Sequence, residues 1–132
     1  MSSAVGMILA VVMSAMGGGA SEPEVGWASQ YDRGVMDRVV QTRLRYRHIP
    51  SDLSTFDGFV ATPYCSDIGR VIYIRPEGTD RWERFLAVDC AGPDETLGWM
   101  RRNNILVEVD YNTAVRWNTV GKGIRIETMT AW

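Results

Sequence analysis

Histidine, lysine and cysteine are scarce in this chain of 132 residues. His48 is the one histidine, Lys122 the one lysine, and Cys65 and Cys90 are the two cysteines. Two cysteines and one distant histidine lack the ligand spacing of a zinc site, so we expect no metal and no cofactor. A Gly-rich phosphate loop and a nucleophile elbow are also missing, which argues against nucleotide-dependent and serine-hydrolase chemistry.

A strong charge of one sign is missing as well. The formal net charge is −2, and thirteen of the fourteen basic residues are arginine. A protein that binds nucleic acid through its phosphates needs a basic surface, so we expect no nucleic-acid partner.

The first twenty residues contain no charged side chain, and an apolar run covers residues 4–13. This run is shorter than the ~20 residues that span a bilayer. The small residues that follow, up to Ala20, are typical of a signal-peptidase site. We therefore predict a secretory signal over residues 1–20, although the missing positive charge before the run leaves an uncleaved N-terminal anchor open. Both alternatives predict an extracytoplasmic protein, which meets a membrane only if the segment is uncleaved.

The remaining length allows one domain, predicted over residues 26–128. Apolar patterning predicts a mainly β fold, a small six-stranded barrel with two or three short helices. Asp94 is the expected N-cap of the second helix, and a surface loop is expected over residues 46–58. The expected strands cover residues 26–31, 59–62, 70–75, 82–89, 105–109 and 121–128, and the expected helices 34–44, 94–104 and 111–117.

Three separated segments resemble one known barrel family. Cys65 precedes the apolar run 68–74, Cys90 ends the run 85–91, and the run 105–110 leads into a helical segment at 111–114. Together they resemble the double-psi β-barrel shared by barwin, the expansins and the rare lipoprotein A family, over roughly residues 26–127. The resemblance implies a small secreted barrel near a cell wall. We expect a monomer whose partner is peptidoglycan or another polysaccharide.

The two cysteines are expected to form a disulfide. Paired cysteines are the rule in exported proteins with an even cysteine count. A bridge between Cys65 and Cys90 would close a loop of about 26 residues, which stabilises a small fold.

Asp89 is the first candidate catalytic residue. In rare lipoprotein A relatives an Asp-Arg-Gly-Pro turn supplies the acid that cleaves glycan strands, and the matching segment here is Asp89-Cys90-Ala91-Gly92-Pro93. The resemblance thus implies that Asp89 acts as a general acid. The alternative, in which Asp89 accepts backbone N–H groups of its own turn, is equally open.

Asp110 is the second candidate. It matches the acidic residue that opens the Asp-Leu-Ser helix of expansins and their relatives, although the sequence here continues Tyr111-Asn112. A pair of carboxylates is the usual machinery of glycosidic cleavage. An aspartate that opens a helix is also a common N-cap, and this second interpretation is favoured.

The catalytic histidine of the rare lipoprotein A enzymes has no counterpart. It would fall near Pro63, and His48 does not align with it. Catalysis therefore stays an open question. Tyr31, Tyr64 and Trp99 are predicted to bind substrate, because each lies at a strand end or in a loop where an aromatic face can stack on a sugar.

Three hypotheses follow. The first is an exported barrel that binds wall or extracellular polysaccharide, and the second is a peptidoglycan lytic transglycosylase-like enzyme that uses Asp89 and Asp110. The third is a protein-binding or inhibitory barrel without glycan activity. The first two predict an acidic and aromatic groove near Asp89. The third predicts that both aspartates are engaged by backbone groups.

Overall fold

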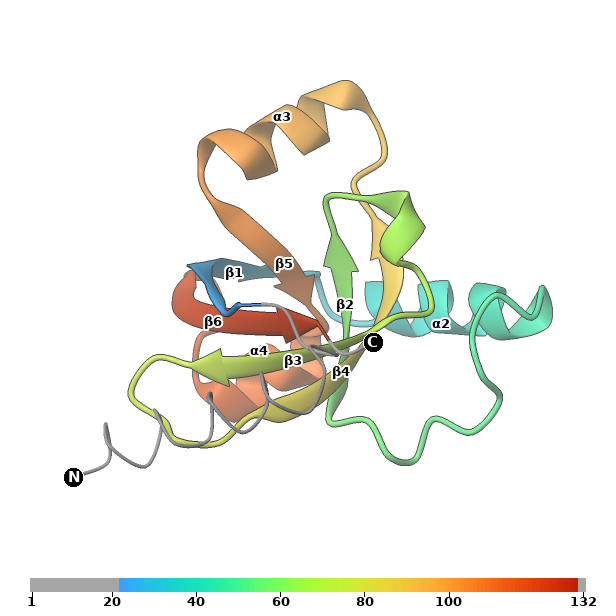
Figure 1. Cartoon of the computed structure of the whole chain (residues 1–132). Coiled ribbons are helices and arrows are strands. Elements are labelled where there is room, and N and C mark those ends of the chain that lie inside the picture. Colours follow the sequence, from blue (N-terminus) through green and yellow to red (C-terminus); the bar gives the residue numbers. More distant parts are fainter. Residues whose placement is uncertain (1–21, 131–132) are drawn as a thin grey trace.

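Six strands close into a barrel in the computed structural model, which describes residues 22–130 (Figure 1). The order around the barrel is β1-β5-β2-β4-β3-β6, and the predicted barrel is thereby confirmed. The predicted signal or anchor over residues 1–20 lies outside the described residues. The strands are β1 (Glu24–Gln30), β2 (Gly58–Thr62), β3 (Val71–Pro76), β4 (Glu83–Cys90), β5 (Ile105–Val109) and β6 (Ile124–Thr130).

Two of the six strand pairs are parallel, and both join strands far apart in the sequence. β1 runs parallel to β5 and β2 runs parallel to β4, whereas the other four pairs are antiparallel. Parallel neighbours require a crossover, and the helical segments lie in these connections. One end of the barrel therefore receives chain segments from several parts of the sequence.

The barrel interior is filled by alternate apolar residues of the strands. Ile72 and Ile74 on β3, Phe85 and Ala87 on β4, and Val107 on β5 belong to one buried cluster. Burial of each large side chain contributes ~1.5–3 kcal/mol, so this alternation favours one register over a slip by a single residue.

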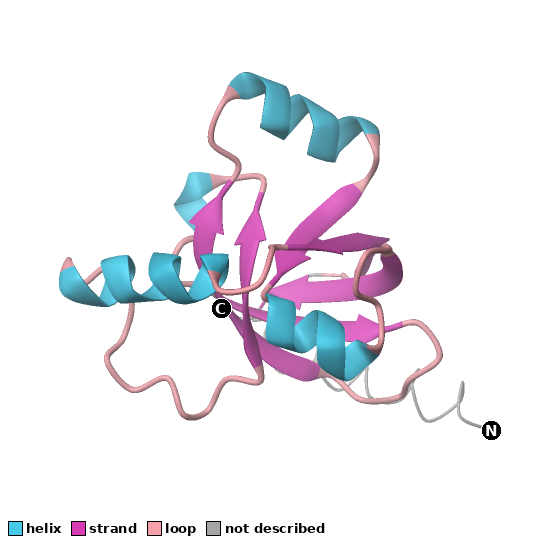
Figure 2. Ribbon diagram, turned by 180° about the vertical axis from the view of Figure 1, so that it is seen from behind, coloured by secondary structure: helices cyan, strands magenta, loops and turns pink. Residues whose placement is uncertain are grey.

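Three short helices lie outside the barrel wall within the described residues (Figure 2). They are α2 (Val35–Arg45), α3 (Asp94–Arg102) and α4 (Tyr111–Trp117). Met36 and Val40 of α2 pack against Leu86 and Val88 on the outer face of β4. α3 lies at one end of the barrel (Figure 1), where its buried Met100 packs against Ala91 and Ile105. No helix among residues 22–130 has the length and apolarity to cross a bilayer.

The N-terminus of α3 differs from the prediction. The N-cap is Pro93 with extended backbone, and no side chain caps the helix. Asp94 instead lies in the first turn. Its carboxylate there faces the positive end of the helix dipole, which favours the helix without a capping hydrogen bond.

Both parallel pairs contain a register irregularity. Trp27 faces Ile105 whereas Ala28 faces Val107, so β5 advances two residues while β1 advances one. The β2–β4 pair shows the same step, because Val60 faces Ala87 and Ala61 faces Asp89. Such bulges change the face to which later side chains point.

The disulfide between Cys65 and Cys90 is present, which confirms the predicted bridge. Cys65 begins the short 3-10 helix η1 (Cys65–Asp67), and Cys90 is the last residue of β4. The bridge therefore fixes the loop after β2 to the end of the strand that contains Asp89.

We predict that replacement of both cysteines by alanine lowers the free energy of unfolding by about 3–4 kcal/mol. The bridge closes a sequence separation of 25 residues, and its removal returns that loop's conformational freedom to the unfolded chain. Urea unfolding of the oxidised protein and of the double variant measures the difference. A difference below about 1 kcal/mol would show that the bridge hardly constrains the unfolded chain.

Candidate functional site

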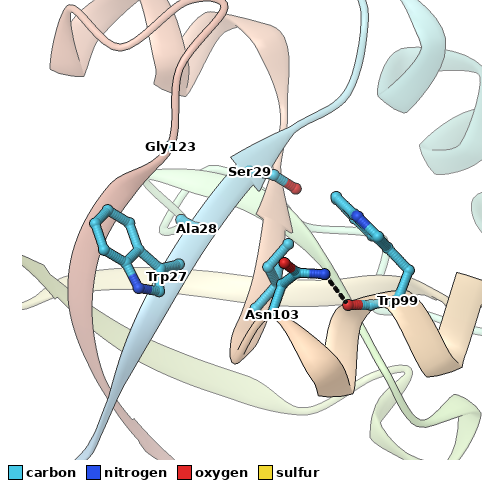
Figure 3. A pocket seen from close by; sticks show the side chains of 7 residues that line it. Trp27, Ala28, Ser29, Trp99, Asn103 and Gly123 are labelled. Carbon is cyan, nitrogen blue, oxygen red and sulfur yellow. Dashed lines mark hydrogen bonds between the residues drawn. The ribbon is translucent and has the colours of Figure 1, made fainter.

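An open groove of about 370 Å³ lies between β1 and α3 (Figure 3). The two exposed tryptophans in it come from different elements, Trp27 from β1 and Trp99 from α3. Figure 3 shows the Trp27 indole on the side of Gly123 and the Trp99 indole on the side of α3, with the Ser29 hydroxyl between them. The lining residues are Trp27, Ala28, Ser29, Trp99, Asn103, Ile105 and Gly123.

The strand alternation of β1 explains why Trp27 faces solvent. Gly26 and Ala28 are buried, so Trp27 and Ser29 point outward. Trp27 is 41% exposed and Trp99 is 42% exposed. Large apolar side chains held at this exposure on two walls of a groove offer stacking faces to a flat ligand.

Ser29 connects this groove to a carboxylate. Its hydroxyl donates a hydrogen bond of 3.1 Å to Oε2 of Glu108. Ser29 and Glu108 are direct register partners on β1 and β5. Glu108 points outward because Val107 and Val109, its neighbours on β5, are both buried.

Asp89 lies at the end of β4 beside this pair. Its Oδ2 accepts a hydrogen bond of 2.7 Å from the Tyr31 hydroxyl, and its Oδ1 is 3.5 Å from Nη2 of Arg43. Both partners are side chains, so these contacts differ from the backbone-only interpretation of Asp89. Arg43 is fixed in turn, because its Nε donates to the carbonyl of Val88 at 2.8 Å.

Glu108 and Asp89 lie on either side of one small residue. Ala61 on β2 is the register partner of Glu108 on one side and of Asp89 on the other. With adjacent strands ~4.8 Å apart, the two acidic residues are separated by about 10 Å at the backbone. One row of side chains therefore crosses the four neighbouring strands β1, β5, β2 and β4. It consists of Ser29, Glu108, Ala61 and Asp89.

The charges in this row act on one another. Burial raises the pKa of Glu108, the Ser29 hydrogen bond opposes this rise, and the negative charge of Asp89 adds to it. Burial also raises the pKa of Tyr31, and its hydrogen bond to Asp89 and the charges of Asp89 and Glu108 raise it further. Tyr31 therefore stays protonated and serves as a hydrogen-bond donor.

His48 contacts this cluster through Arg43. Its Nδ1 lies 3.2 Å from Nη1 of Arg43, and its ring stacks on Tyr46. His48 is exposed. Its contact with Asp89 is thus indirect, through the guanidinium that also binds the carboxylate.

Asp110 is the N-cap of α4. Its Oδ1 accepts from the Phe59 backbone N–H at 2.9 Å and from the Thr113 hydroxyl at 2.7 Å, and its Oδ2 accepts from the Thr113 N–H at 3.2 Å. The side chain is buried, and a Cβ on Gly58 would lie 2.7 Å from its Oδ1. This geometry is that of the N-cap interpretation and engages both carboxylate oxygens in holding β2 and α4 together.

The structure groups some predicted site residues and separates others. Tyr31 contacts Asp89, and Trp99 lines the groove next to Ser29. Tyr64 lies elsewhere, in a second groove of about 440 Å³ that also includes Arg70 and Arg101. Sequence reasoning did not single out Trp27, Ser29 or Glu108. Glu108 is the one charged residue in the predicted strand 105–109. This feature is visible in the sequence, but the sequence does not show which residue lies beside it.

Within residues 22–130, no three His, Cys, Asp or Glu side chains gather into a possible metal site. Searches of family models, of curated proteins and of solved structures found no match to this chain.

We predict that Asp110→Ala lowers the free energy of unfolding by about 2–3 kcal/mol. The change removes an N-cap and leaves the Phe59 N–H without its acceptor. Urea unfolding tests this, with Asn112→Ala as the control because Asn112 is exposed on the same helix. Equal stability of the two variants would contradict the structural role of Asp110.

We predict that Glu108→Gln stabilises the protein increasingly as the pH rises. Because the folded pKa of Glu108 is raised, the wild type loses stability from about 4.5, the ordinary glutamate value, up to the raised folded value. Glutamine does not ionise and can still accept the Ser29 hydrogen bond. Unfolding midpoints in urea at pH 4 and pH 7 measure the effect, with Glu95→Gln on the exposed side of α3 as the control. A stability difference between wild type and Glu108→Gln that does not change with pH would contradict the prediction.

Proposed function

We propose that this barrel is an exported protein that binds cell-wall or other extracellular polysaccharide in the groove between β1 and α3. The observation that carries the proposal is the pair of exposed tryptophans, Trp27 and Trp99, on two walls of one groove. Sugar rings present apolar C–H faces that stack on indoles, while their hydroxyls need hydrogen-bonding groups at the edges. Ser29 and Asn103 provide such groups in the same groove.

The proposal includes membership of the double-psi barrel superfamily of barwin, the expansins and rare lipoprotein A. Two parallel strand pairs in a closed six-stranded barrel are consistent with the resemblance seen in the sequence. The disulfide supports export, because such bonds persist in oxidising compartments. Its position next to Asp89 suits a site that must stay rigid outside the cell.

A second candidate function is glycosidic cleavage, and the observation that favours it is the presence of Glu108 and Asp89 on one barrel face. Glu108 is half-buried with a raised pKa, as expected of a general acid, while Asp89 faces the cation Arg43. In this scheme Glu108 takes the place given to Asp110 by the family resemblance. Polysaccharide binding remains the leading proposal because the groove lining is aromatic and neutral.

We predict that Trp27→Ala and Trp99→Ala each weaken binding to insoluble glycan about tenfold, since each removes one stacking face. Pelleting with peptidoglycan and with β-glucans measures binding, and chromatography of the supernatant detects soluble products. Tyr46→Ala is the matched control, because Tyr46 is an exposed aromatic outside the groove.

The outcomes separate the candidate functions. No pelleting with any glycan, or equal loss in Tyr46→Ala, would overturn the binding proposal. Soluble products from the wild type that disappear in Glu108→Gln would establish cleavage as the function. The fold of each variant is checked by circular dichroism before binding is compared.

A further inference from the structure

We propose that the end of α2 and the turn after it form a second binding surface, which holds acidic polysaccharide through Arg45 and Arg47. Residues 43–48 are called the basic turn below. This surface is separate from the tryptophan groove. The proposal rests on the proposed function in one respect, because export is what brings the protein to such polysaccharides.

The basic turn lies in a stretch of the chain that has no acidic side chain. Residues 38–51 contain four arginines and the one histidine, but no aspartate and no glutamate. The whole chain, in contrast, has a formal net charge of −2. Positive charge is therefore denser in this stretch than in the chain as a whole.

Arg45 and Arg47 differ from most other arginines of the protein in having no carboxylate partner. Elsewhere the ion pairs are Arg70–Asp67, Arg75–Glu127, Arg81–Asp57, Arg116–Glu83 and Arg125–Glu77. Within the basic turn, Arg43 lies 3.5 Å from Asp89. Among residues 22–130 no ion pair includes Arg45 or Arg47, and both residues are exposed. Arg43 thus neutralises Asp89, and the charges of Arg45 and Arg47 are available to a ligand.

The backbone of Arg47 gives a second, independent argument. The Arg47 N–H donates to the carbonyl of Leu44 at 3.1 Å, the His48 N–H donates to the carbonyl of Arg43 at 2.9 Å, and the φ angle of Arg47 is 57°. This left-handed helix end is usually formed by glycine, or by asparagine, because a Cβ disfavours the conformation.

Arginine at this position is the exception within the molecule as well. Among residues 22–130, the other two non-glycine residues with a positive φ are Asn104 and Asn118. Arg47 therefore keeps a long basic side chain at a place where its backbone is disfavoured. Such backbone strain gathers at functional sites, which supports a binding role for this side chain.

Contacts around the basic turn hold it in place. The Nε of Arg43 donates to the carbonyl of Val88 at 2.8 Å, and the His48 ring stacks on Tyr46. A Cβ on Gly69 would lie 3.5 Å from the His48 carbonyl oxygen, so the turn packs against the segment before β3. A fixed backbone lowers the entropy that is lost when the arginines bind a ligand. Figures 1 and 2 show this end of α2 projecting beyond the strands, where a long polymer can reach it.

Acidic polysaccharide fits this surface better than a membrane does. Met36 and Val40 of α2 are buried against β4, so the helix has no free apolar face to insert into lipid. Guanidinium groups bind carboxylate and phosphate oxygens in a bidentate geometry. The ligand that we propose is therefore a glycan that carries such anionic groups.

The test compares an oligogalacturonate with its fully methyl-esterified form, which has the same backbone without the charge. Titration calorimetry at pH 7 gives the dissociation constants at about 20 mM and about 300 mM salt. In the wild type we expect the oligogalacturonate to bind at least about fivefold tighter than its ester at low salt. This difference should shrink at high salt, because salt screens exposed charges.

The double variant Arg45→Gln/Arg47→Gln isolates the basic turn. We expect it to remove the preference for the oligogalacturonate and to change the affinity for the ester less than about twofold. Arg101→Gln/Arg102→Gln is the matched control, because it removes the same charge from two exposed arginines of α3. An equal or larger loss of oligogalacturonate binding in the control would overturn the proposal, since net charge or another surface would then govern binding.

Arg47→Gly separates a binding role from a structural one. Because glycine favours the left-handed helix end, we expect this variant to be at least as stable in urea as the wild type and yet to bind oligogalacturonate about threefold or more weakly. Asn118→Gly makes the same change at the left-handed end of α4 and should leave binding unchanged. An Arg47→Gly variant that binds like the wild type would contradict the proposal.

Failure of this proposal and failure of the proposed function are distinguishable. Binding of neutral glycan that depends on Trp27 and Trp99, without any preference for the acidic oligomer, would preserve the function and overturn the second surface. A preference for the acidic oligomer that depends on Arg45 and Arg47, without binding of neutral glycan, would do the reverse. Tighter binding of anionic vesicles, or of an oligonucleotide with the same number of charges, would overturn acidic polysaccharide as the partner.

Discussion

The two bulges in the parallel strand pairs are the constraint on which the candidate site depends. In β4, Phe85 and Ala87 point into the core, and strict alternation would send Asp89 there as well. The bulge in β4 opposite Val60 and Ala61 turns the Asp89 side chain to the outside of the barrel. There it contacts Tyr31 and Arg43. The bulge in β5 has a similar effect. Ile105 packs against α3 outside the barrel, whereas Val107, two residues later, lies in the core. Without these steps the acidic row across four strands would not form.

Asp110 and Glu108 have different roles: Asp110 holds parts of the fold together, whereas Glu108 lies on the outer face of the barrel. Asp110 is buried and engaged on both oxygens, so its charge is used to hold β2 and α4. Glu108, two residues earlier in the chain, lies on the outer face of β5, where its carboxylate accepts a hydrogen bond from the Ser29 hydroxyl. The two residues have unrelated roles because β5 ends at Val109 and the chain turns into α4 at Asp110, so strand alternation does not set the direction of Asp110.

The local elements were largely predictable from the sequence, and the site was predictable only in part. The run Ile105–Val109 and the helix Tyr111–Trp117 were placed correctly, because their apolar spacing is unambiguous. Tyr31 follows the end of β1 and contacts Asp89, and Trp99 lies within α3 and lines the groove, so their role in binding stays a prediction. Glu108 and Trp27 could not be selected, since their significance arises from strand pairing between β1 and β5, and two bulges decide which faces they share. Tyr64 was assigned to the same groove, but α3 and β5 separate it from Trp99.

The pairing of β1 with β6 has a consequence for how the chain folds. Glu24 faces Thr128 and Val25 faces Glu127, so the first strand finds its neighbours only after almost the whole domain has been synthesised. Its other neighbour, β5, is also remote in sequence. Contacts of such long range are slow to form, on the order of milliseconds to seconds. β1 must therefore remain unpaired while synthesis proceeds, and barrel closure is a late, post-translational event. The disulfide does not depend on this order, because Cys65 is exposed and Cys90 is the half-buried last residue of β4, so an oxidant can reach the pair before or after the barrel closes.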